Sequence, residues 1–516
     1  MIAQPANHRV FPAALGALAA VLLGGGPSAQ AFEPASTHAG MTHRAAQHLQ
    51  LLHRWLVRVH GLPLGSYEPL RLDTSLVPTV LREPLIRHLG ELDPVHGYRP
   101  DADGRNRAAS WLLAGAVLEG MPFSRSRHHF LDPRTGRGLR NASGKAGTAL
   151  RLRFLDFSEG QGDLGGIFTG ANFDLTGMSV LRWARHPDNA FNLERHLAHR
   201  VASFTAPTLA ARRHNLAMSL ISLGALLHLV QEMAVPAMVR NDFVASYLEQ
   251  RSNIALDRAS AFEILVRRRY GRNGIPRVSP GDALPPFGRF DDHFTNSARS
   301  GLADRTQASF FSLGSLPRPL RLRDNDTEQS ATHAMSRSLP YPSPALGRLH
   351  LMRSARTGEA FYHGSSTNPY LIAYRVSRQG IVQVTLDDRC HEAAAERLVP
   401  EAVRYSAALL GFLLRGELIT KLSADGRNLH VTHSGPALRS GTLSLLGEDS
   451  AGRRTLLKAA TIGAPMSRPS DLLASFDLSN LPSSVKTIVV VLQGTDISKE
   501  PLVLGASLPR RASDKP

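Results

Sequence analysis

The stretch LISLGALLHLVQEMAVPAM, residues 220–238, constrains the fold more than any other part of the chain. Apolar residues fill nearly every position, which predicts a helix buried on all sides, ending near Pro236. His228 and Glu232 lie one helical turn apart, so their side chains point the same way. A buried carboxylate without a partner costs several kcal/mol and is normally paired with a cation or a metal. Three interpretations stay open: a metal site, a His–Glu pair, and an ion pair from Glu232 to an arginine such as Arg240.

Apolar residues recur at helical spacing through much of the first 415 residues, which predicts a mostly helical domain over 32–415. The expected helices cover 42–60, 108–118, 193–202, 209–235, 257–269 and 391–415. Between about 271 and 364 the composition shifts to Pro, Gly, Ser and Arg, which predicts a long irregular insertion. After Gly416, short alternating runs separated by turn residues predict a small C-terminal β-sandwich over 416–508.

The N-terminus has the features of a secretory signal peptide over residues 1–31. An apolar run from Ala13 to Leu23 is too short to span a bilayer, and Ala29-Gln30-Ala31 fits a cleavage site. Cleavage would make Phe32 the first residue and place the protein in the periplasm or outside the cell; a membrane anchor is the competing interpretation. The only cysteine, Cys390, excludes an internal disulfide, so packing and bound metal are the remaining ways to hold an exported chain together.

The net charge of +17 favours anionic partners: phosphate-bearing substrates, lipid headgroups or nucleic acid. Aromatic residues make up only 6% of the chain and do not cluster with the basic ones. Binding of single strands relies on aromatic side chains for base stacking, so this composition favours lipid or small phosphodiester substrates over nucleic acid.

Two further clusters add ligand-type side chains. Glu119 ends an apolar helical run that begins at Trp111, and His129 follows it ten residues later in a loop. His38 lies just behind the expected new N-terminus. Each residue alone is more often an ordinary buried polar group. Together with the pair on the apolar helix they supply three histidines and two carboxylates, a mixture of nitrogen and oxygen ligands that suits zinc.

Three motifs carry a resemblance to a known family: THAGMTHRA, AGAVLEG…RHHFLDP and LGALLHLVQEMAVPAMVRNDF. In this order they resemble the superfamily of zinc-dependent phospholipase C and single-strand-specific nuclease, over residues 32–262. The resemblance implies a mostly helical domain with a zinc cluster that hydrolyses phosphodiester bonds. By position, one zinc would take Glu119, His129, His228 and Glu232. A second would take His38 and the backbone amine and carbonyl of Phe32, with Glu232 bridging the two ions.

The third zinc of the family is expected to be degenerate in this chain. Met238 and Ala259 stand where the resemblance implies histidines, and Glu263 is the one remaining acid of that set. Methionine is a poor zinc ligand compared with imidazole or carboxylate. We therefore expect two zinc ions, with the third site doubtful.

The resemblance implies an exported zinc phosphodiesterase of phospholipase C kind, in which metal-bound hydroxide attacks phosphorus. Glu119 and Glu232 are the expected catalytic residues, with Glu119 orienting the hydroxide or accepting its proton. Arg125 and Arg240 are candidate cations for the role of the missing third zinc. Phospholipid is the expected substrate, with peripheral contact to a membrane. The alternatives are a single-strand nuclease of the same superfamily and a non-catalytic binding protein on a decayed metallohydrolase fold.

Overall fold

The computed structural model describes most of the chain between residues 34 and 509. The described ranges are 34–77, 100–120, 123–139, 176–242, 260–271, 274–279, 281–321, 327–339, 361–365, 368–377, 379–463 and 470–509, with a few isolated positions besides. The expected signal peptide over 1–31, Phe32 and Ala259 lie outside these residues.

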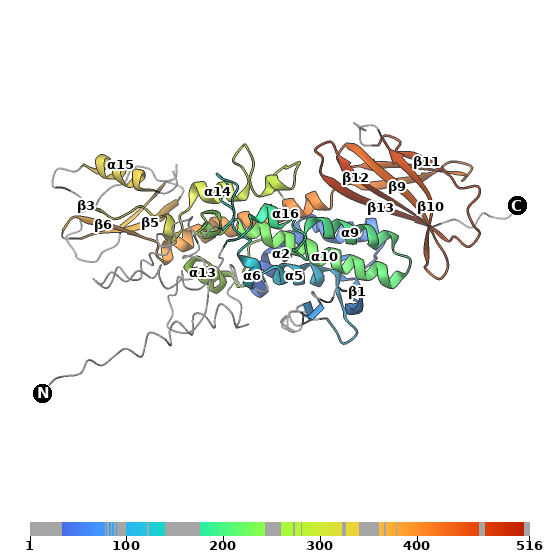
Figure 1. Cartoon of the computed structure of the whole chain (residues 1–516), viewed down its shortest axis with the longest axis horizontal. Helices are drawn as coiled ribbons and strands as arrows, with labels where there is room; N and C mark the ends of the chain where they lie inside the picture. The colour runs from blue at the N-terminus through green and yellow to red at the C-terminus, as the bar shows by residue number, and fades with distance from the viewer. Residues whose placement is uncertain are drawn as a thin grey trace.

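A helical body forms the middle of the molecule (Figure 1). Its longer helices are α2 (Ala39–Gln47), α3 (Leu51–His60), α5 (Ala108–Glu119), α9 (Leu193–Thr205), α10 (Leu209–Glu232), α13 (Ala261–Tyr270) and α16 (Asp388–Leu413). Shorter helical segments are η1 (Pro34–His38), η2 (His48–Gln50), η3 (Gly65–Tyr67), η4 (Thr74–Leu76), α6 (Phe123–Ser126), α8 (Val180–Trp183) and α11 (Pro236–Val239). Two short strands, β1 (Pro69–Arg71) and β2 (Arg105–Arg107), pair antiparallel beside them.

Helices α5 and α10 pack together at the centre of the body. An added Cβ on Gly115 of α5 would lie 1.9 Å from the carbonyl oxygen of Ile221, and one on Gly224 of α10 would lie 1.8 Å from that of Leu112. The two backbones can approach this closely only because both positions are glycine. Helix α10 is long and apolar enough to cross a membrane, but 94% of its most apolar window is buried inside the protein.

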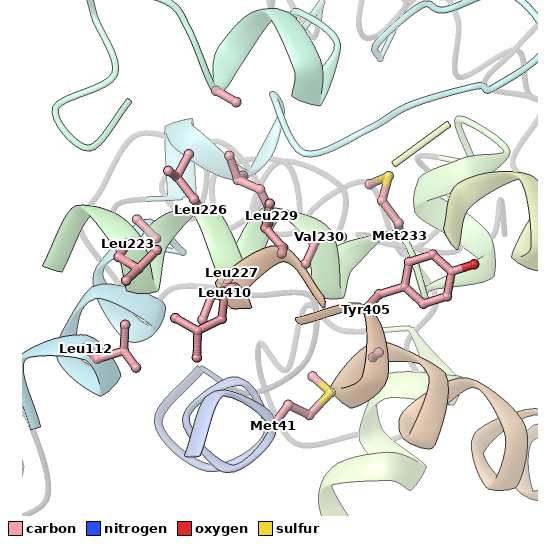
Figure 2. Close-up of a cluster of buried hydrophobic side chains, with 14 of the residues drawn as sticks. Met41, Leu112, Leu223, Leu226, Leu227, Leu229, Val230, Met233, Tyr405 and Leu410 are labelled. Carbon is pink, nitrogen blue, oxygen red and sulfur yellow. The ribbon is translucent and has the colours of Figure 1, made fainter. Parts of the chain in front are cut away.

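Side chains from four helices fill the core around this contact. Met41 of α2, Leu112 of α5, Leu227 of α10 and Leu410 of α16 are all fully buried and belong to one cluster (Figure 2). Because helices surround this part of α10, every residue from Leu216 to Glu232 is buried, as the sequence predicts.

Two helix boundaries differ from the expected ones. Helix α10 ends at Glu232 rather than at Val235, because Val235 precedes a proline and takes an extended conformation with φ −92° and ψ 115°. The helix expected over 42–60 is broken at Leu49 and Gln50, whose φ angles of 48° and 53° are left-handed. The break separates α2 from α3. His38 lies at the other end of α2, just before its first residue.

The segment 271–364 contains more regular structure than its composition predicts. Its described parts include η7 (Asp291–His293), α14 (Leu302–Ser309), η8 (Leu313–Ser315), β3 (Leu320–Arg321) and α15 (Glu328–Ser338), and β4 (Phe361–Ser365) starts in it. With β5 (Asn368–Val376) and β6 (Ile381–Thr385), these strands form an antiparallel sheet in the order β3-β6-β5-β4. Between β5 and β6 the N–H of Gly380, whose φ is 72°, donates to the Ser377 carbonyl at 2.9 Å. This sheet lies at the end of the helical body opposite the C-terminal domain (Figure 1).

A β-sandwich follows α16, which confirms the predicted fold class of a mostly helical domain with a C-terminal sandwich. Its strands are β7 (Glu417–Leu422), β8 (Asn428–Ser434), β9 (Leu438–Glu448), β10 (Arg454–Ile462), β11 (Ala474–Asp477), β12 (Thr487–Asp496) and β13 (Pro501–Pro509). One sheet has the order β10-β9-β12-β13 and the other β11-β8-β7. Strand β8 buries every second residue, and its Leu429 and Val431 belong to one buried cluster with Leu445 and Val490 of the other sheet.

Candidate metal centre

Four segments far apart in the chain bring polar side chains to one buried point. His38 ends η1, Glu119 ends α5, His129 lies in the loop after α6, and α10 carries His228 and Glu232. Each of these five side chains is at most 1% exposed. Near the end of α10, His228 faces α5 and Glu232 faces η1, so neither side chain reaches solvent. The structure therefore brings together all the candidate ligands that lie within its described residues, apart from Glu263.

The carboxylate of Glu232 is the centre of this cluster. Its Oε1 lies 3.1 Å from His228 Nε2, 3.5 Å from His38 Nε2 and 3.4 Å from His129 Nδ1. One ligand atom from each of His38, His228 and Glu232 lies within 4.8 Å of the others, which is close enough to share an ion. The His38 and His228 rings are stacked with centroids 3.7 Å apart. The resemblance assigns these two histidines to different zinc ions bridged by Glu232, and in the structure both face the same oxygen of that carboxylate.

The proton on His228 is placed by a backbone carbonyl. His228 Nδ1 lies 2.7 Å from the carbonyl oxygen of Ala116, which can only accept, so Nδ1 carries the proton. Burial and the neighbouring His38 lower the pKa of His228 to about 4, so the ring is neutral near pH 7. Its Nε2 then presents a lone pair to Glu232 Oε1, which is also an acceptor.

His38 is oriented in the same way by Gln231. The amide nitrogen of Gln231 donates to Thr42 Oγ1 at 2.9 Å and to Ser406 Oγ at 3.2 Å, which turns its Oε1 toward His38 Nδ1 at 2.6 Å. His38 therefore donates from Nδ1 and points its Nε2 at Glu232 Oε1. Histidines that ligate a metal characteristically donate their other ring N–H to a carbonyl or a similar acceptor, and both rings show this pattern.

The donor atoms at this point fit a divalent metal ion. Glu232 Oε2 is buried without a hydrogen-bond partner among the described residues. Burial raises the pKa of Glu232, but hydrogen bonding, above all from His129, outweighs burial and holds the pKa well below its ordinary value. An ionised carboxylate facing two imidazole lone pairs is unfavourable unless a cation lies between them. Two imidazoles and a carboxylate form a set that zinc accepts in its catalytic sites.

His129 lies between the two carboxylates. Its Nδ1 is 3.4 Å from Glu232 Oε1 and its Nε2 is 3.4 Å from Glu119 Oε1. Burial disfavours the charged ring, but the two carboxylates raise the pKa of His129 above its ordinary value. A charged His–Glu pair therefore forms at His129, whereas the sequence left such a pair open between His228 and Glu232. That pair does not account for the lone pairs of the other two histidines.

Glu119 is bound by an arginine and a tryptophan. Arg125 Nη2 lies 2.5 Å from Glu119 Oε2, and Trp183 Nε1 donates to Glu119 Oε1 at 2.8 Å. Burial disfavours ionisation of Glu119, but Arg125, His129 and His228 more than offset it and lower the pKa to about 2. Such a carboxylate is a weak base. The geometry thus weighs against the expected role of Glu119 as the proton acceptor.

The remaining predicted residues have other partners. Glu263 forms a capping box at the start of α13, where its carboxylate accepts from the Ser260 backbone N–H at 2.6 Å. Met238 is fully buried in α11. The guanidinium of Arg240 donates to the carbonyl oxygens of Phe310, at 2.8 Å, and Gln307, so it is not the cation that pairs with Glu232. Among the described residues, a third cluster of ligands does not form around Met238 and Glu263.

The sequence interpretation missed Gln231, Trp183 and Asn189, and all three support the cluster. Gln231 is a polar residue inside an otherwise apolar helix. The same feature indicates Glu232, so the sequence pattern was sufficient to indicate Gln231 as well. Trp183 lies 64 residues beyond Glu119, and Asn189 lies 64 residues beyond its partner Arg125, in an ordinary polar stretch, so only the folded chain brings them together.

No protein-family model matches this chain, and no curated protein matches it either. Among solved structures, the chain is similar to the alpha-toxin of Clostridium perfringens avian strain SWCP, with 11% identity, 93% of this chain and 98% of that chain covered, and a TM-score of 0.29. It is also similar to the alpha toxin of Clostridium absonum, with 11% identity, 93% and 96% covered, and a TM-score of 0.28. Scores this low do not establish a shared fold, and the metal centre is interpreted from its own contacts.

Proposed function

We propose that this chain is an exported zinc-dependent phosphodiester hydrolase of phospholipase C kind. The observation that supports it best is the convergence of His38, His228 and Glu232 within 4.8 Å, with imidazole lone pairs facing a carboxylate. Catalytic zinc commonly takes three protein ligands of these types and keeps a fourth position for water. The resemblance of the three sequence motifs to zinc-dependent phospholipases C gives the reaction class, and the basic charge of the chain suits a phosphate-bearing substrate.

The residues of the chain prepare this position before any ion binds. The Ala116 carbonyl and the Gln231 amide fix which nitrogen of each ring is available, and the apolar walls of α5 and α10 keep competing water away. Glu232 supplies the negative charge. Bound zinc would lower the pKa of a coordinated water and polarise a phosphoryl oxygen. Glu119 has no place as a base in this proposal, since both its oxygens are engaged.

Phospholipid is the substrate we propose, which entails peripheral contact with a membrane. The low aromatic content supports this choice over single-stranded nucleic acid. Export and cleavage before Phe32 belong to the same proposal, and the mass of the protein recovered from the periplasm or culture medium would test them.

A matched pair of variants tests the metal site. In Glu232→Gln the carboxylate at the cluster becomes a neutral amide, and we expect loss of bound zinc and of phosphodiesterase activity. Glu263→Gln makes the same change in another buried glutamate, and we expect it to keep both. Zinc per chain is measured by plasma mass spectrometry after desalting, and hydrolysis is measured on phosphatidylcholine vesicles and on single-stranded DNA.

Each outcome bears on one interpretation. Hydrolysis of the vesicles supports the proposal, whereas cleavage of DNA alone supports the nuclease. Zinc in the Glu232→Gln variant at the level of the unaltered protein contradicts the metal site. A protein without zinc and without either activity supports the non-catalytic binding protein.

A further inference from the structure

We infer that Arg125 is a built-in cation that takes the place of a second metal ion beside Glu119. The centre then holds a single divalent ion, at His38, His228 and Glu232, rather than the two that the sequence predicts. This inference rests on the metal site proposed above. It concerns the number of ions that the site accepts and the residue that sets this number.

The guanidinium of Arg125 is held firmly on several sides. Its Nη2 lies 2.5 Å from Glu119 Oε2 and donates to Asn189 Oδ1 at 2.7 Å, and its Nε donates to the backbone oxygen of Glu119 at 3.2 Å. The rings of Trp183 and Phe191 each lie with their centroid 5.2 Å from the guanidinium carbon. A charge-assisted, buried bond with this much support is strong, so Arg125 is a fixed part of the site.

Arg125 and Trp183 leave Glu119 poorly suited to ligate a metal. One oxygen accepts from the guanidinium and the other accepts from Trp183 Nε1 at 2.8 Å. Coordination by Glu119 would break a charge-assisted hydrogen bond inside the protein and leave a buried guanidinium without its carboxylate. Without Glu119, the part of the chain that the structure describes would offer a second ion His129 and a share of Glu232, which is fewer protein ligands than zinc sites have.

The positive charge of Arg125 also disfavours a second ion beside Glu119. Arginine stays protonated in proteins, so Arg125 cannot make room for a metal by losing its proton, as a lysine or a histidine could. A divalent ion next to Glu119 would lie close to this fixed positive charge in a buried site, where repulsion between like charges is strong. An ion held by His38 and His228 would lie farther from the guanidinium, because the contacts run from Glu232 through His129 and Glu119 to Arg125.

Counting bound zinc tests the inference without any assay of activity. The mature protein is loaded with zinc, desalted and analysed by plasma mass spectrometry, and it is titrated with cobalt(II) while the visible absorption is followed. We expect about one ion per chain in the unaltered protein and about two in Arg125→Met, where Glu119 and His129 become free to ligate. Arg182→Met removes an exposed arginine from the neighbouring helix α8, and we expect it to keep about one ion.

A second variant replaces Arg125→Met as the test if that protein folds poorly, because the change leaves a buried carboxylate without its cation. Glu119→Gln keeps the shape of the side chain and its contacts with Arg125. If Glu119 is not a ligand, this variant binds about one zinc as the unaltered protein does. Loss of that zinc in Glu119→Gln would show that Glu119 is a ligand and overturn the inference.

The outcomes separate this inference from the proposed function. One ion in both the unaltered protein and Arg125→Met leaves the metal site standing and rejects the role of Arg125. Two ions in the unaltered protein reject it as well, since the arginine then fails to exclude the second ion. Zinc in neither protein rejects the metal site itself, and with it the proposed function.

Discussion

At the scale of single residues, the amide of Gln231 decides which nitrogen of His38 faces Glu232. The hydroxyl groups of Thr42 and Ser406 accept from its nitrogen, so its oxygen must face the ring. The same ring would present an N–H to Glu232 if this amide were turned around. Metal affinity therefore depends on a residue that is not itself a ligand.

Replacing Gln231 should weaken metal binding through His38. Gln231→Met removes the acceptor for the Nδ1 proton, and the zinc dissociation constant should rise by about 10- to 100-fold. Gln231→Glu keeps an acceptor at the same place and should bind zinc about as tightly as the unaltered protein. Competition with a coloured chelator measures both. Equal affinity in Gln231→Met and the unaltered protein would remove Gln231 from the site.

At the scale of helices, the contact of α5 with α10 determines where the site lies. The close approach of the two backbones at Gly115 and Gly224 puts the Ala116 carbonyl beside His228 Nδ1. It also places Glu119, at the end of α5, within reach of the loop that carries His129. A shift of one helix along the other would break these contacts together.

A methyl group at the contact should force the two helices apart. Gly115→Ala places a Cβ 1.9 Å from a backbone oxygen, which cannot move alone, and should lower the free energy of unfolding by about 1–3 kcal/mol or more. Zinc affinity should fall with it, because His228 loses its acceptor.

Gly411→Ala in α16 is the control, since the nearest atom to its new Cβ would be a leucine methyl 3.9 Å away. This change should leave stability equal or raise it by up to about 1 kcal/mol, because alanine favours helix. Denaturation in urea measures both variants. Equal stability of the two would show that the helices can separate at little cost.

At the scale of the whole molecule, a partly buried network of an ion pair and hydrogen bonds joins the sandwich to the helical body. Glu448 of β9 accepts from Arg212 of α10 at 3.0 Å and from Arg454 of β10 at 2.6 Å, and Arg454 also donates to the Phe204 carbonyl of α9 at 2.6 Å. Phe204 packs against Gly505 of β13, where an added Cβ would lie 2.3 Å from its ring. The sandwich is therefore docked on the helices that carry the metal centre.

Removing the charge of Glu448 should loosen this junction. Arg212 is only 4% exposed, so Glu448→Gln leaves its charge without a carboxylate, and stability should fall by about 1–3 kcal/mol. Glu417→Gln changes another contact between the domains, with Arg58, but those side chains are 42% and 55% exposed. Its effect should stay within about 1 kcal/mol, as for other surface pairs. Thermal unfolding compares the two variants, and a larger loss for Glu417→Gln would contradict this account.

The sequence predicts most helices of the body and the sandwich, because each depends on apolar spacing within a short stretch. The break at Leu49 and Gln50 has no such signal, since neither residue type favours a left-handed conformation. The sheet β3-β6-β5-β4 was missed for a related reason. Strand β3 pairs with a strand far along the chain, Leu320 opposite Val382 of β6, and it lies in a stretch whose Pro, Gly and Ser content is typical of loops.

The sequence alone determines that His228 and Glu232 are buried on one face of an apolar helix, because that burial follows from their immediate neighbours. A compensating partner for the carboxylate is then required by the energy of burying a charge. Only the tertiary structure decides which partner each acid receives. Arg125 pairs with Glu119, Glu263 caps a helix, and Glu232 faces three histidines. These outcomes depend on distances between atoms from separate segments, and local sequence patterns do not encode such distances.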